Sequence, residues 1–450
     1  MLTNPTNVIN SYVPAIRENY ISTSIIQNKA QNKLDALKSS NTFINSILGS
    51  LNSTLFIVDS KMRLIGFNDN NHLIFTRAEH EVIGFLFGKS CGCANANKNN
   101  GICGTTPACK NCNIRGSIVN CIQTKESTRN IPIGHTLFRE QNDVKRELMF
   151  STKYISYQEE EMVLVIIDDI TELERQKQEI IKSRNEILGS IEYAKRIQQA
   201  VLPRKTKLNS VLGDHFVLYK PLNIVSGDFY YAASIGDWRI AIVADCTGHG
   251  VPGAFMSLLS ITYLKEIIEK DGIVRPDIIL NELRNSIIKA LRKQNNNLAL
   301  LEMDKQILED VVESLSDGLD ISVCVRNNKN NELLFAGANS SLYLVRNNEM
   351  HEYKGNRMPV GYYLKMDKFS YQKILTQKDD VIYMSSDGYY DQFGGNNGKK
   401  LKNKRFKEIL VEISSLEMKH QGEKLLEVYN SWKAKEPQID DVCVIGIRTE

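Results

Sequence analysis

The segment 226–255, SGDFYYAASIGDWRIAIVADCTGHGVPGAF, constrains the fold more than any other part of the chain. Its two apolar runs, FYYAAS and WRIAIVAD, lie on either side of Gly236 and Asp237, and a Gly-Asp turn between such runs predicts a β-hairpin. A turn centred there places Asp228 directly opposite Asp245 at the open end of the hairpin. Because like charges facing each other across a strand pair are destabilising, we expect a hydrated divalent cation between these carboxylates. The alternative, two solvated strand-end aspartates, is disfavoured by the glycine-rich surroundings.

Two further apolar runs carry aspartates at their ends. Asp387, followed by Gly388, ends the run VIYMSS, and Asp440 and Asp441 precede the last apolar run, VCVIGI. Each arrangement alone is common, but together they place carboxylates at four separate strand ends. Since Mg²⁺ and Mn²⁺ prefer carboxylate oxygens, the pattern predicts a binuclear site for hard cations.

Five motifs of the C-terminal part occur in the order GDFYY, ADCTGHGVPGAFMSLL, AGANSSLYLVRN, SSDGYYDQFGG and DDVCVIGI. In order and spacing they resemble the motifs of SpoIIE-type and RsbU-type bacterial protein phosphatases, which belong to the metal-dependent type 2C (PPM) superfamily. The resemblance spans roughly residues 190–450. It implies an α+β fold, a β-sandwich of two antiparallel sheets with helices on both outer faces, and hydrolysis of phosphoserine or phosphothreonine by a metal-activated water.

The resemblance also implies roles for single residues. Two Mn²⁺ or Mg²⁺ ions would be coordinated by four aspartates, Asp228, Asp245, Asp387 and Asp440. Cys246 would add its backbone carbonyl, and Asp441 falls near the metals or the phosphate. Two such cations lower the pKa of a bridging water, so no covalent protein intermediate is needed.

Other positions near these motifs leave alternatives open. His249 is the nearest candidate for the general acid that protonates the leaving oxygen, and the alternative is a turn histidine that packs on a helix start. Asp317 and Asp320 are expected in a turn that starts a strand, with contact to a third metal as the alternative. Position 443 is Cys, where many phosphatases with these motifs have Thr. No arginine is assigned to phosphate binding. The charged segment 275–316 is expected to be a helical insertion, with a role as a flap or as a substrate-recognition surface left open.

Residues 171–204 are expected to form a long charged helix that links two domains. A stripe of apolar residues recurs at intervals of seven: Leu173, Ile180, Ile187, Ala194 and Val201. This spacing on a polar helix is typical of a coiled-coil seam and predicts a parallel homodimer, with a single helix packed on its own domain as the alternative. Pro203 is expected to end the helix.

Before the linker, residues 41–170 are expected to form a small α/β domain after an N-terminal extension, residues 1–40. The runs TLFIVD, RLIGFN, KRELMFSTKYIS and EMVLVIIDDIT are typical of strands. Their order, and the ending DDITE, resemble a PAS sensor domain. The predicted chain is therefore a PAS-like sensor, a coiled-coil linker and a PPM-type phosphatase domain at residues 205–450.

Six of the nine cysteines fall within the 31 residues from Cys91 to Cys121. In a reducing compartment such crowding indicates metal or redox chemistry before disulfides. The segment resembles a cysteine-bearing insertion of some bacterial PAS domains, and the matching positions are Cys93, Cys103, Cys109 and Cys112. These four predict zinc or an iron–sulfur cluster, with redox-reactive free thiols or inert cysteines as alternatives. The remaining three cysteines, Cys246, Cys324 and Cys443, are expected to be buried in the phosphatase domain.

Composition narrows the choice of partners and location. Lys and Arg number 56 against 53 Asp and Glu, a net charge of +3 that gives no support for nucleic-acid binding. The longest aliphatic run, 162–167, is too short for a membrane helix, and the N-terminus lacks a signal-peptide pattern, so we expect a cytoplasmic protein. By resemblance, the partner is a phosphorylated anti-sigma-factor antagonist. The alternative function is a catalytically inactive scaffold that binds a partner through the same fold.

Overall fold

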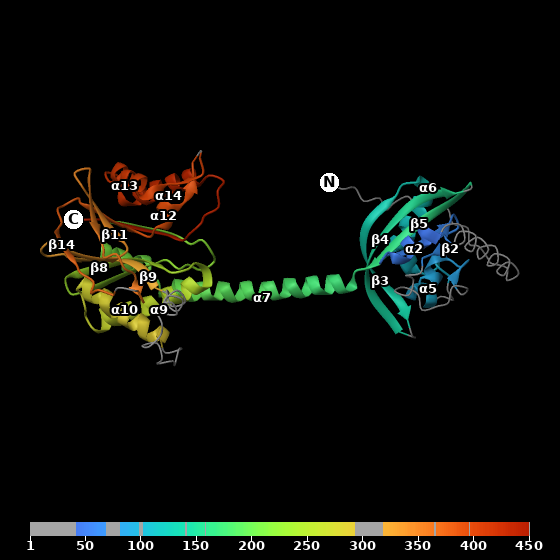
Figure 1. Cartoon of the computed structure of the whole chain (residues 1–450), viewed down its shortest axis with the longest axis horizontal. Coiled ribbons are helices and arrows are strands. Elements are labelled where there is room, and N and C mark those ends of the chain that lie inside the picture. Colours follow the sequence, from blue (N-terminus) through green and yellow to red (C-terminus); the bar gives the residue numbers. More distant parts are fainter. Residues whose placement is uncertain are drawn as a thin grey trace. The chain divides into compact units, whose positions relative to one another are not determined.

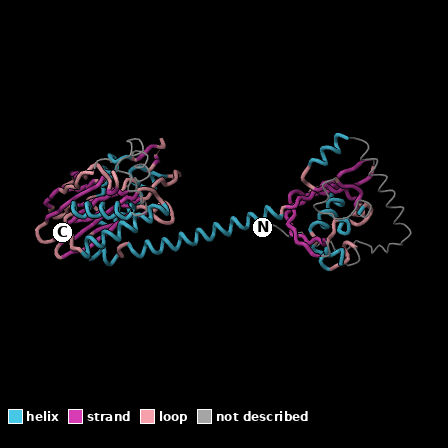
Figure 2. Tube along the Cα trace, turned by 60° about the horizontal axis from the view of Figure 1, so that its bottom comes forward, coloured by secondary structure: helices cyan, strands magenta, loops and turns pink. Residues whose placement is uncertain are grey.

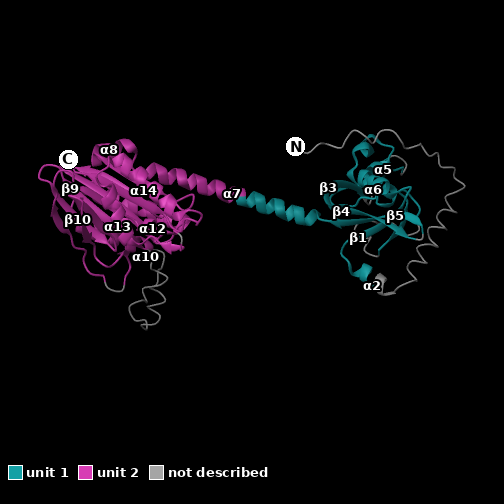
Figure 3. Cartoon of the chain, turned by 90° about the horizontal axis from the view of Figure 1, so that it is seen from above, with its two compact units in different colours: residues 1–184 teal, residues 185–450 magenta. Residues whose placement is uncertain are grey.

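A computed structural model describes residues 42–68, 82–98, 102–139, 142–157, 159–292, 318–363, 366–395 and 397–449. The chain divides into two compact units, residues 1–184 and 185–450 (Figure 3). The boundary falls inside helix α7 (Thr171–Val201), which belongs in part to each unit. The expected N-terminal extension, residues 1–40, lies outside the described residues.

The N-terminal unit is built on one antiparallel sheet of five strands in the order β2-β1-β5-β4-β3. The strands are β1 (Thr54–Asp59), β2 (Leu64–Phe67), β3 (Thr128–Arg139), β4 (Asn142–Tyr157) and β5 (Glu160–Asp169). The helical segments are α2 (Thr42–Ser50), α4 (Phe87–Ser90), α5 (Ala94–Lys98), η2 (Pro107–Asn111) and α6 (Asn113–Thr124). The four predicted strands are confirmed as β1, β2, β4 and β5. The sequence did not indicate β3, because Pro132 and Gly134 interrupt its pattern.

Helix α7 confirms the predicted linker helix and ends two residues before Pro203. Three residues of its apolar stripe are exposed to solvent: Leu173 by 62%, Ile180 by 68% and Ile187 by 58%. This part of the stripe is thus left exposed by the described residues, and the coiled-coil seam and its alternative both stay predictions. Gln198 is the one residue of α7 that is buried.

The C-terminal unit contains two antiparallel sheets, drawn as arrows in Figure 1 and in magenta in Figure 2. One has the order β14-β10-β9-β8-β7, with β13 on β9, and the other has the order β12-β11-β15-β18-β6. The strands are β6 (His215–Lys220), β7 (Phe229–Ile235), β8 (Trp238–Cys246), β9 (Gly318–Asn327), β10 (Glu332–Ala338), β11 (Ser341–Arg346), β12 (Glu349–Lys354), β13 (Val360–Gly361), β14 (Gln372–Leu375), β15 (Val381–Ser385) and β18 (Val442–Arg448). A small hairpin consists of β16 (Phe393–Gly394) and β17 (Lys399–Lys400).

Helices lie on both outer faces of these sheets (Figure 1). They are α9 (Gly250–Lys265) with its π-helical continuation η3 (Glu266–Lys270), α10 (Pro276–Arg292), α12 (Gly388–Asp391), α13 (Lys402–Ile413) and α14 (Met418–Lys433). Helix α8 (Lys205–Leu212) packs instead on the apolar cluster between the sheets. One apolar cluster fills the space between the sheets and includes Phe335, Leu344 and Ile445. A second joins α9 and α10 to the first sheet, and a third joins α13 and α14 to the other. The predicted two-sheet sandwich with helices on both faces is thus confirmed.

The helix predicted at the start of segment 275–316 is confirmed as α10, but this part of the segment does not form a flap. The apolar face of α10, formed by Ile279, Leu280, Leu283 and Ile287, is fully buried against the sheet. Each such side chain contributes about 1.5–3 kcal/mol by burial, so α10 is a core helix and not a mobile insertion. Residues 293–317 lie outside the described residues. The helical stretch Gly250–Lys270 is long and apolar enough to pass for a membrane span, but half of its most apolar window is buried in this unit.

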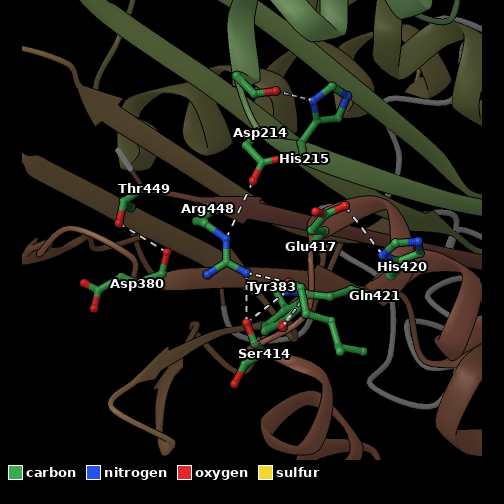
Figure 4. A network of polar contacts seen from close by, with 12 residues as sticks. Asp214, His215, Asp380, Tyr383, Ser414, Glu417, His420, Gln421, Arg448 and Thr449 are labelled. Atoms are coloured by element: carbon green, nitrogen blue, oxygen red, sulfur yellow. Dashed lines mark hydrogen bonds and ion pairs between the residues drawn. The ribbon is translucent and has the colours of Figure 1, made fainter.

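A polar network around Arg448 fixes the last strand of the unit (Figure 4). Its guanidinium donates to the Ser414 carbonyl at 2.9 Å and forms an ion pair with Asp214 at 3.6 Å. Nearby, the Tyr383 hydroxyl donates to Gln421 at 2.6 Å. Because β18 begins directly after Asp440 and Asp441, these contacts also hold the strand that presents two of the predicted site residues.

Candidate active site

The hairpin of β7 and β8 has the predicted register. Phe229 pairs with Ala244 and Ile235 pairs with Trp238, while Gly236 takes a φ of +55° in the turn. The same register, continued by one residue, places Asp228 opposite Asp245. The predicted register of the hairpin is therefore confirmed, and the side chains of Asp228 and Asp245 lie within hydrogen-bonding reach of each other.

Three glycines allow the loop before β7 to pack directly against the turn after β8. A side chain at Gly253 would overlap the Gly248 carbonyl oxygen and would lie 2.8 Å from the Gly227 Cα. A side chain at Gly227 would lie 2.6 Å from that oxygen and 3.2 Å from the carbonyl oxygen of Cys246. Only backbone fits between these segments, and the Cys246 carbonyl therefore faces the loop that carries Asp228.

Asp387 and Asp440 are also brought together by a close approach of backbone segments at a glycine. A side chain at Gly388 would overlap the Asp441 carbonyl oxygen and would lie 3.1 Å from the Asp440 Cβ. The turn after β15, which carries Asp387, thus packs directly on the turn before β18. Since β15 and β18 are neighbouring antiparallel strands, the two turns also lie at the same edge of one sheet.

Ser386 joins these turns to the hairpin, and no sequence pattern had indicated this role. Its hydroxyl donates to Asp228 Oδ2 at 2.5 Å and accepts the backbone N–H of Cys443 at 3.0 Å. Its own N–H donates to the Cys443 carbonyl at 2.9 Å. Ser386 therefore fixes the orientation of the Asp228 carboxylate from the opposite sheet.

The carboxyl groups brought together in this way repel one another. Asp245 lies within hydrogen-bonding reach of both Asp228 and Asp387. The pKa values of Asp228, Asp245, Asp387 and Asp440 are all raised, first because burial disfavours the charged form and then because neighbouring carboxylates repel. Asp228 Oδ1 and Asp387 Oδ1 are buried and have no hydrogen-bond partner. Such orphaned oxygens are costly unless a cation pairs with them.

The donor set fits hard divalent cations. Four carboxylates and a backbone carbonyl are the ligands that Mn²⁺ and Mg²⁺ prefer. Within the described ranges, no set of three His, Cys, Asp or Glu side chains is already arranged around an ion position. The aspartates therefore form a convergent acidic cluster, and the particular ligand roles of these residues stay predictions.

The carboxylate of Asp441 accepts two backbone hydrogen bonds and therefore has a structural role. Its Oδ1 accepts the N–H of Leu222 at 2.6 Å and its Oδ2 accepts the N–H of Gly227 at 2.8 Å. The side chain is buried, with 2% exposure. Asp441 thus anchors the loop that leads into Asp228, and its expected place near the metals or phosphate stays a prediction.

His249 lies at the N-terminal cap of α9 with its side chain exposed to solvent. Its Nδ1 is 3.0 Å from Oδ1 of Asn223, which leaves Nε2 as the nitrogen able to exchange a proton with a ligand. The ring lies close enough to Asp440 to lower the pKa of that carboxyl, against the larger effect of burial, which raises it. His249 thus lies at the helix start with an exposed ring, and its role as a general acid stays a prediction. Asn223 is a partner that sequence reasoning missed.

Two other charged residues lie beside the aspartates. Asp320 is a strand residue of β9 and pairs with Asp245, so its expected place in a turn is wrong. Burial raises the pKa of Asp320 to about 6, while Asn339 donates to its Oδ1 at 2.9 Å. Lys400 pairs with Asp391 at 2.7 Å, and its charge also acts on Asp387. Asp317 lies outside the described residues.

The predicted cysteine ligands lie in the N-terminal unit, and Cys109 and Cys112 flank the end of η2. All nine cysteines are free thiols in this structure. The other three, Cys246, Cys324 and Cys443, are buried in the C-terminal unit as predicted.

Comparisons with known proteins agree with this construction. The family described as Stage II sporulation protein E (SpoIIE) matches residues 236–450. The SiaA-PP2C domain of Pseudomonas aeruginosa is 29% identical, with 60% of this chain and 99% of that chain covered and a TM-score of 0.51. No curated protein sequence matches the chain.

Two further solved structures are more distant. The PP2C phosphatase domain of SpoIIE from Bacillus subtilis, with a fragment of its regulatory domain, is 13% identical, with 72% of this chain and 82% of that chain covered and a TM-score of 0.41. The RsbU and RsbW domains of a Mycobacterium tuberculosis protein are 17% identical, with 53% of this chain and 60% of that chain covered and a TM-score of 0.41.

The helix-covered sandwich and its convergent aspartates define a phosphatase fold of the PPM type. More particularly, residues 236–450 form a SpoIIE-type PPM serine/threonine phosphatase domain. The predicted class of enzyme is thereby confirmed.

Proposed function

We propose that the C-terminal unit hydrolyses phosphoserine or phosphothreonine on a regulatory protein with two Mn²⁺ or Mg²⁺ ions. The ions would be held by Asp228, Asp245, Asp387 and Asp440, with the Cys246 carbonyl as a further ligand. When bound, the two cations supply an activated water and neutralise charge on the phosphate. The observation that carries the proposal is the convergence of four carboxyl groups, two of which, Asp228 and Asp387, have a buried oxygen without a hydrogen-bond partner.

The protein's own residues position this chemistry. Ser386 holds Asp228 by its hydroxyl, and Asp441 holds the preceding loop through Gly227. Asn223 orients the His249 ring, whose Nε2 would donate a proton to the departing serine or threonine oxygen. Lys400 supplies a positive charge beside Asp387 that also attracts a phosphorylated substrate.

The reaction is tested with p-nitrophenyl phosphate and added Mn²⁺. Wild type should hydrolyse it in a metal-dependent way, and Asp387→Asn should lose most of this activity. A wild-type protein without Mn²⁺-dependent hydrolysis would instead favour the inactive scaffold. That alternative is disfavoured because all four expected metal positions carry aspartate.

The substrate we propose is a phosphorylated anti-sigma-factor antagonist. The match to the SpoIIE family and the resemblance of the motifs to RsbU-type enzymes support this choice. A test compares release of phosphate from such a protein with release from an unrelated phosphoserine protein. Equal rates on the two would contradict the assignment.

We further propose that the N-terminal unit is a PAS-like sensor that controls the phosphatase through α7. The antiparallel sheet with helices between β2 and β3 supports the first part. Gln198 supports the second, because its side chain donates to the Ser226 carbonyl at 2.6 Å and to the Ser257 hydroxyl at 2.8 Å. Its amide oxygen also accepts the N–H of Ser226 at 3.2 Å. The end of α7 is thus hydrogen-bonded to the backbone of Ser226, two residues before Asp228.

The same helix is proposed to form a parallel dimer. Its exposed stripe, which includes Ile180 and Ile187, is the support for this arrangement. A change in the packing of two such helices would move Gln198 and, through Ser226, the loop that carries Asp228. A phosphatase domain cut free of the first unit, yet identical to the full chain in activity and association, would contradict this coupling.

A further inference from the structure

Positive charge is concentrated in a short segment that follows α12. Six of the nine residues from Lys399 to Lys407 are lysine or arginine, and no acidic residue occurs between Asp391 and Glu408. The whole chain, in contrast, has a net charge of only +3. This segment includes β17 and the first turn and a half of α13. The charge is therefore a local property of one surface.

Half of these cations are neutralised within the protein. The ion pairs are Lys400 with Asp391 at 2.7 Å, Arg405 with Glu412 at 2.7 Å and Lys407 with Glu352 at 3.1 Å. Among the contacts of the described residues, no ion pair involves the other three cations, which are Lys399, Lys402 and Lys404. All three side chains are exposed to solvent. We call Lys399, Lys402 and Lys404 the basic surface.

The basic surface lies beside the acidic cluster. The turn of α12 begins directly after Asp387, and the Phe406 ring of α13 packs on Tyr389 and Tyr390 of that turn, with centroid distances of 5.0 and 5.7 Å. Helices α12 and α13 are thus direct neighbours (Figure 1). Lys400, next to Lys399 in β17, is close enough for its charge to act on Asp387.

The hairpin that carries Lys399 is held firmly on α14. Gly394 pairs with Lys399, and a side chain at Gly394 would overlap the carbonyl oxygen of Trp432. The N–H of Gly395 donates to that same oxygen at 2.8 Å. Because backbone packs on backbone here, the hairpin presents its lysine from a fixed position.

Gln392 ties the base of this hairpin to the segment that leads into Asp440. The Gln392 side chain is fully buried and donates to the Pro437 carbonyl at 2.8 Å. Its backbone carbonyl accepts the N–H of Leu401 at 3.1 Å, directly before α13. The basic surface is therefore fixed relative to the turns that present Asp387 and Asp440.

The basic residues do not stabilise the helix that they start. Helix α13 has no acidic residue in its first turn, although negative charge is favoured there by the helix dipole. Lys402 and Lys404 stand at this end without an ion pair, so their charges oppose both the dipole and each other. Since local folding does not explain these residues, a role in binding does.

We propose that Lys399, Lys402 and Lys404 form a docking surface for acidic residues that flank the phosphorylated serine or threonine of the protein substrate. The proposal rests on the phosphatase function proposed above. A phosphoprotein fits better than a nucleic acid, because the surface adjoins the aspartates that the phosphorylated side chain must reach. Exposed charges of this kind select partners and speed their encounter.

The test uses two phosphoserine peptides. One carries Asp and Glu on both sides of the phosphoserine, and the other carries Asn and Gln in their place. Their affinities for the full chain are measured by fluorescence anisotropy in EDTA, and their hydrolysis is measured separately with Mn²⁺. Wild type should bind the acidic peptide about tenfold more tightly, since three exposed ion pairs contribute a factor of about two each. The preference should shrink as salt is added, because salt screens exposed charges.

The triple variant Lys399→Gln, Lys402→Gln, Lys404→Gln should bind the two peptides about equally. It should unfold at the same urea concentration as wild type or a higher one, because it relieves repulsion at the start of α13. A matched control removes three exposed lysines at the sheet ends away from the aspartates, with Lys329, Lys373 and Lys378 changed to Gln. This control should keep the preference. If the triple variant does not fold, each single variant should lower the preference about twofold.

The outcomes separate this surface from the phosphatase function. Equal binding of both peptides by wild type, together with Mn²⁺-dependent hydrolysis of both, would overturn the docking surface and leave the reaction standing. Preference for the acidic peptide without any hydrolysis would support the surface and contradict the reaction. A preference that survives in the triple variant, or is lost equally in the control, would also overturn the assignment. An oligonucleotide that displaces the acidic peptide at equal concentration would assign the surface to nucleic acids instead.

Discussion

Replacing Ser386 with alanine should weaken both the stability of the C-terminal unit and its hold on metal. The substitution removes the donor to Asp228 Oδ2 at 2.5 Å and the acceptor of the Cys443 N–H at 3.0 Å. A hydrogen bond to a charged group contributes about 1.5–3 kcal/mol, and a buried N–H left unpaired costs about 1–3 kcal/mol. We therefore expect about 2–4 kcal/mol of destabilisation, since the two losses share one side chain and are not additive.

The neighbouring Ser385→Ala is a matched control. Ser385 is also buried, but its hydroxyl has no hydrogen-bond partner, so its removal should change stability by less than about 1 kcal/mol. Both tryptophans, Trp238 and Trp432, lie in the C-terminal unit, so tryptophan fluorescence in urea reports on this unit within the full chain.

Metal binding gives a second readout for the same pair of variants. A partner that orients a metal ligand typically affects metal affinity by about 10- to 100-fold, so the apparent Kd for Mn²⁺ should rise by that factor in Ser386→Ala. Calorimetric titration of the full chain measures it. Equal unfolding midpoints and equal Mn²⁺ affinities for Ser386→Ala and Ser385→Ala would refute the role given to Ser386.

Three other predictions follow from the contacts described above. Gln198→Ala removes the hydrogen bonds to Ser226, so the affinity for Mn²⁺ should fall about tenfold. Circular dichroism should show that the linker helix is retained. An unchanged Mn²⁺ affinity would count against the coupling. Ile180→Glu with Ile187→Glu should convert a dimer to a monomer in sedimentation, and no change in mass would contradict the coiled coil. His249→Ala should slow the hydrolysis of a phosphoserine protein by about 100-fold or more. It should slow the hydrolysis of p-nitrophenyl phosphate far less, because p-nitrophenolate departs without a proton. Equal losses of activity on the two substrates would contradict a general acid.

The sequence predicted the parts of the site that depend on local pattern. The hairpin register followed from one Gly-Asp turn, because side chains alternate along a strand and a turn fixes the pairing. The aspartates at strand ends could be named for the same reason. The long helix α7 followed from its seven-residue repeat.

Long-range contacts were not predictable from such patterns. Ser386 touches Asp228 across 158 positions, and Gln198 touches Ser257 across 59 positions. Neither contact leaves a periodic signal in the chain. Asp320 was expected in a turn because Asp317 and Gly318 precede it, yet pairing with Asp245 carries β9 through this position. The flap role considered for α10 does not hold because its apolar face matches the sheet, which charge counts alone do not reveal.

Binding of Mn²⁺ to the full chain, followed by electron paramagnetic resonance, tests the central claim most directly. If the four aspartates hold two hard cations, wild type should bind about two Mn²⁺ per chain, and Asp245→Asn should lose both, since Asp245 lies within reach of Asp228 and Asp387. The double variant Cys109→Ser, Cys112→Ser should bind Mn²⁺ as wild type does. Unchanged Mn²⁺ binding in Asp245→Asn would contradict the account.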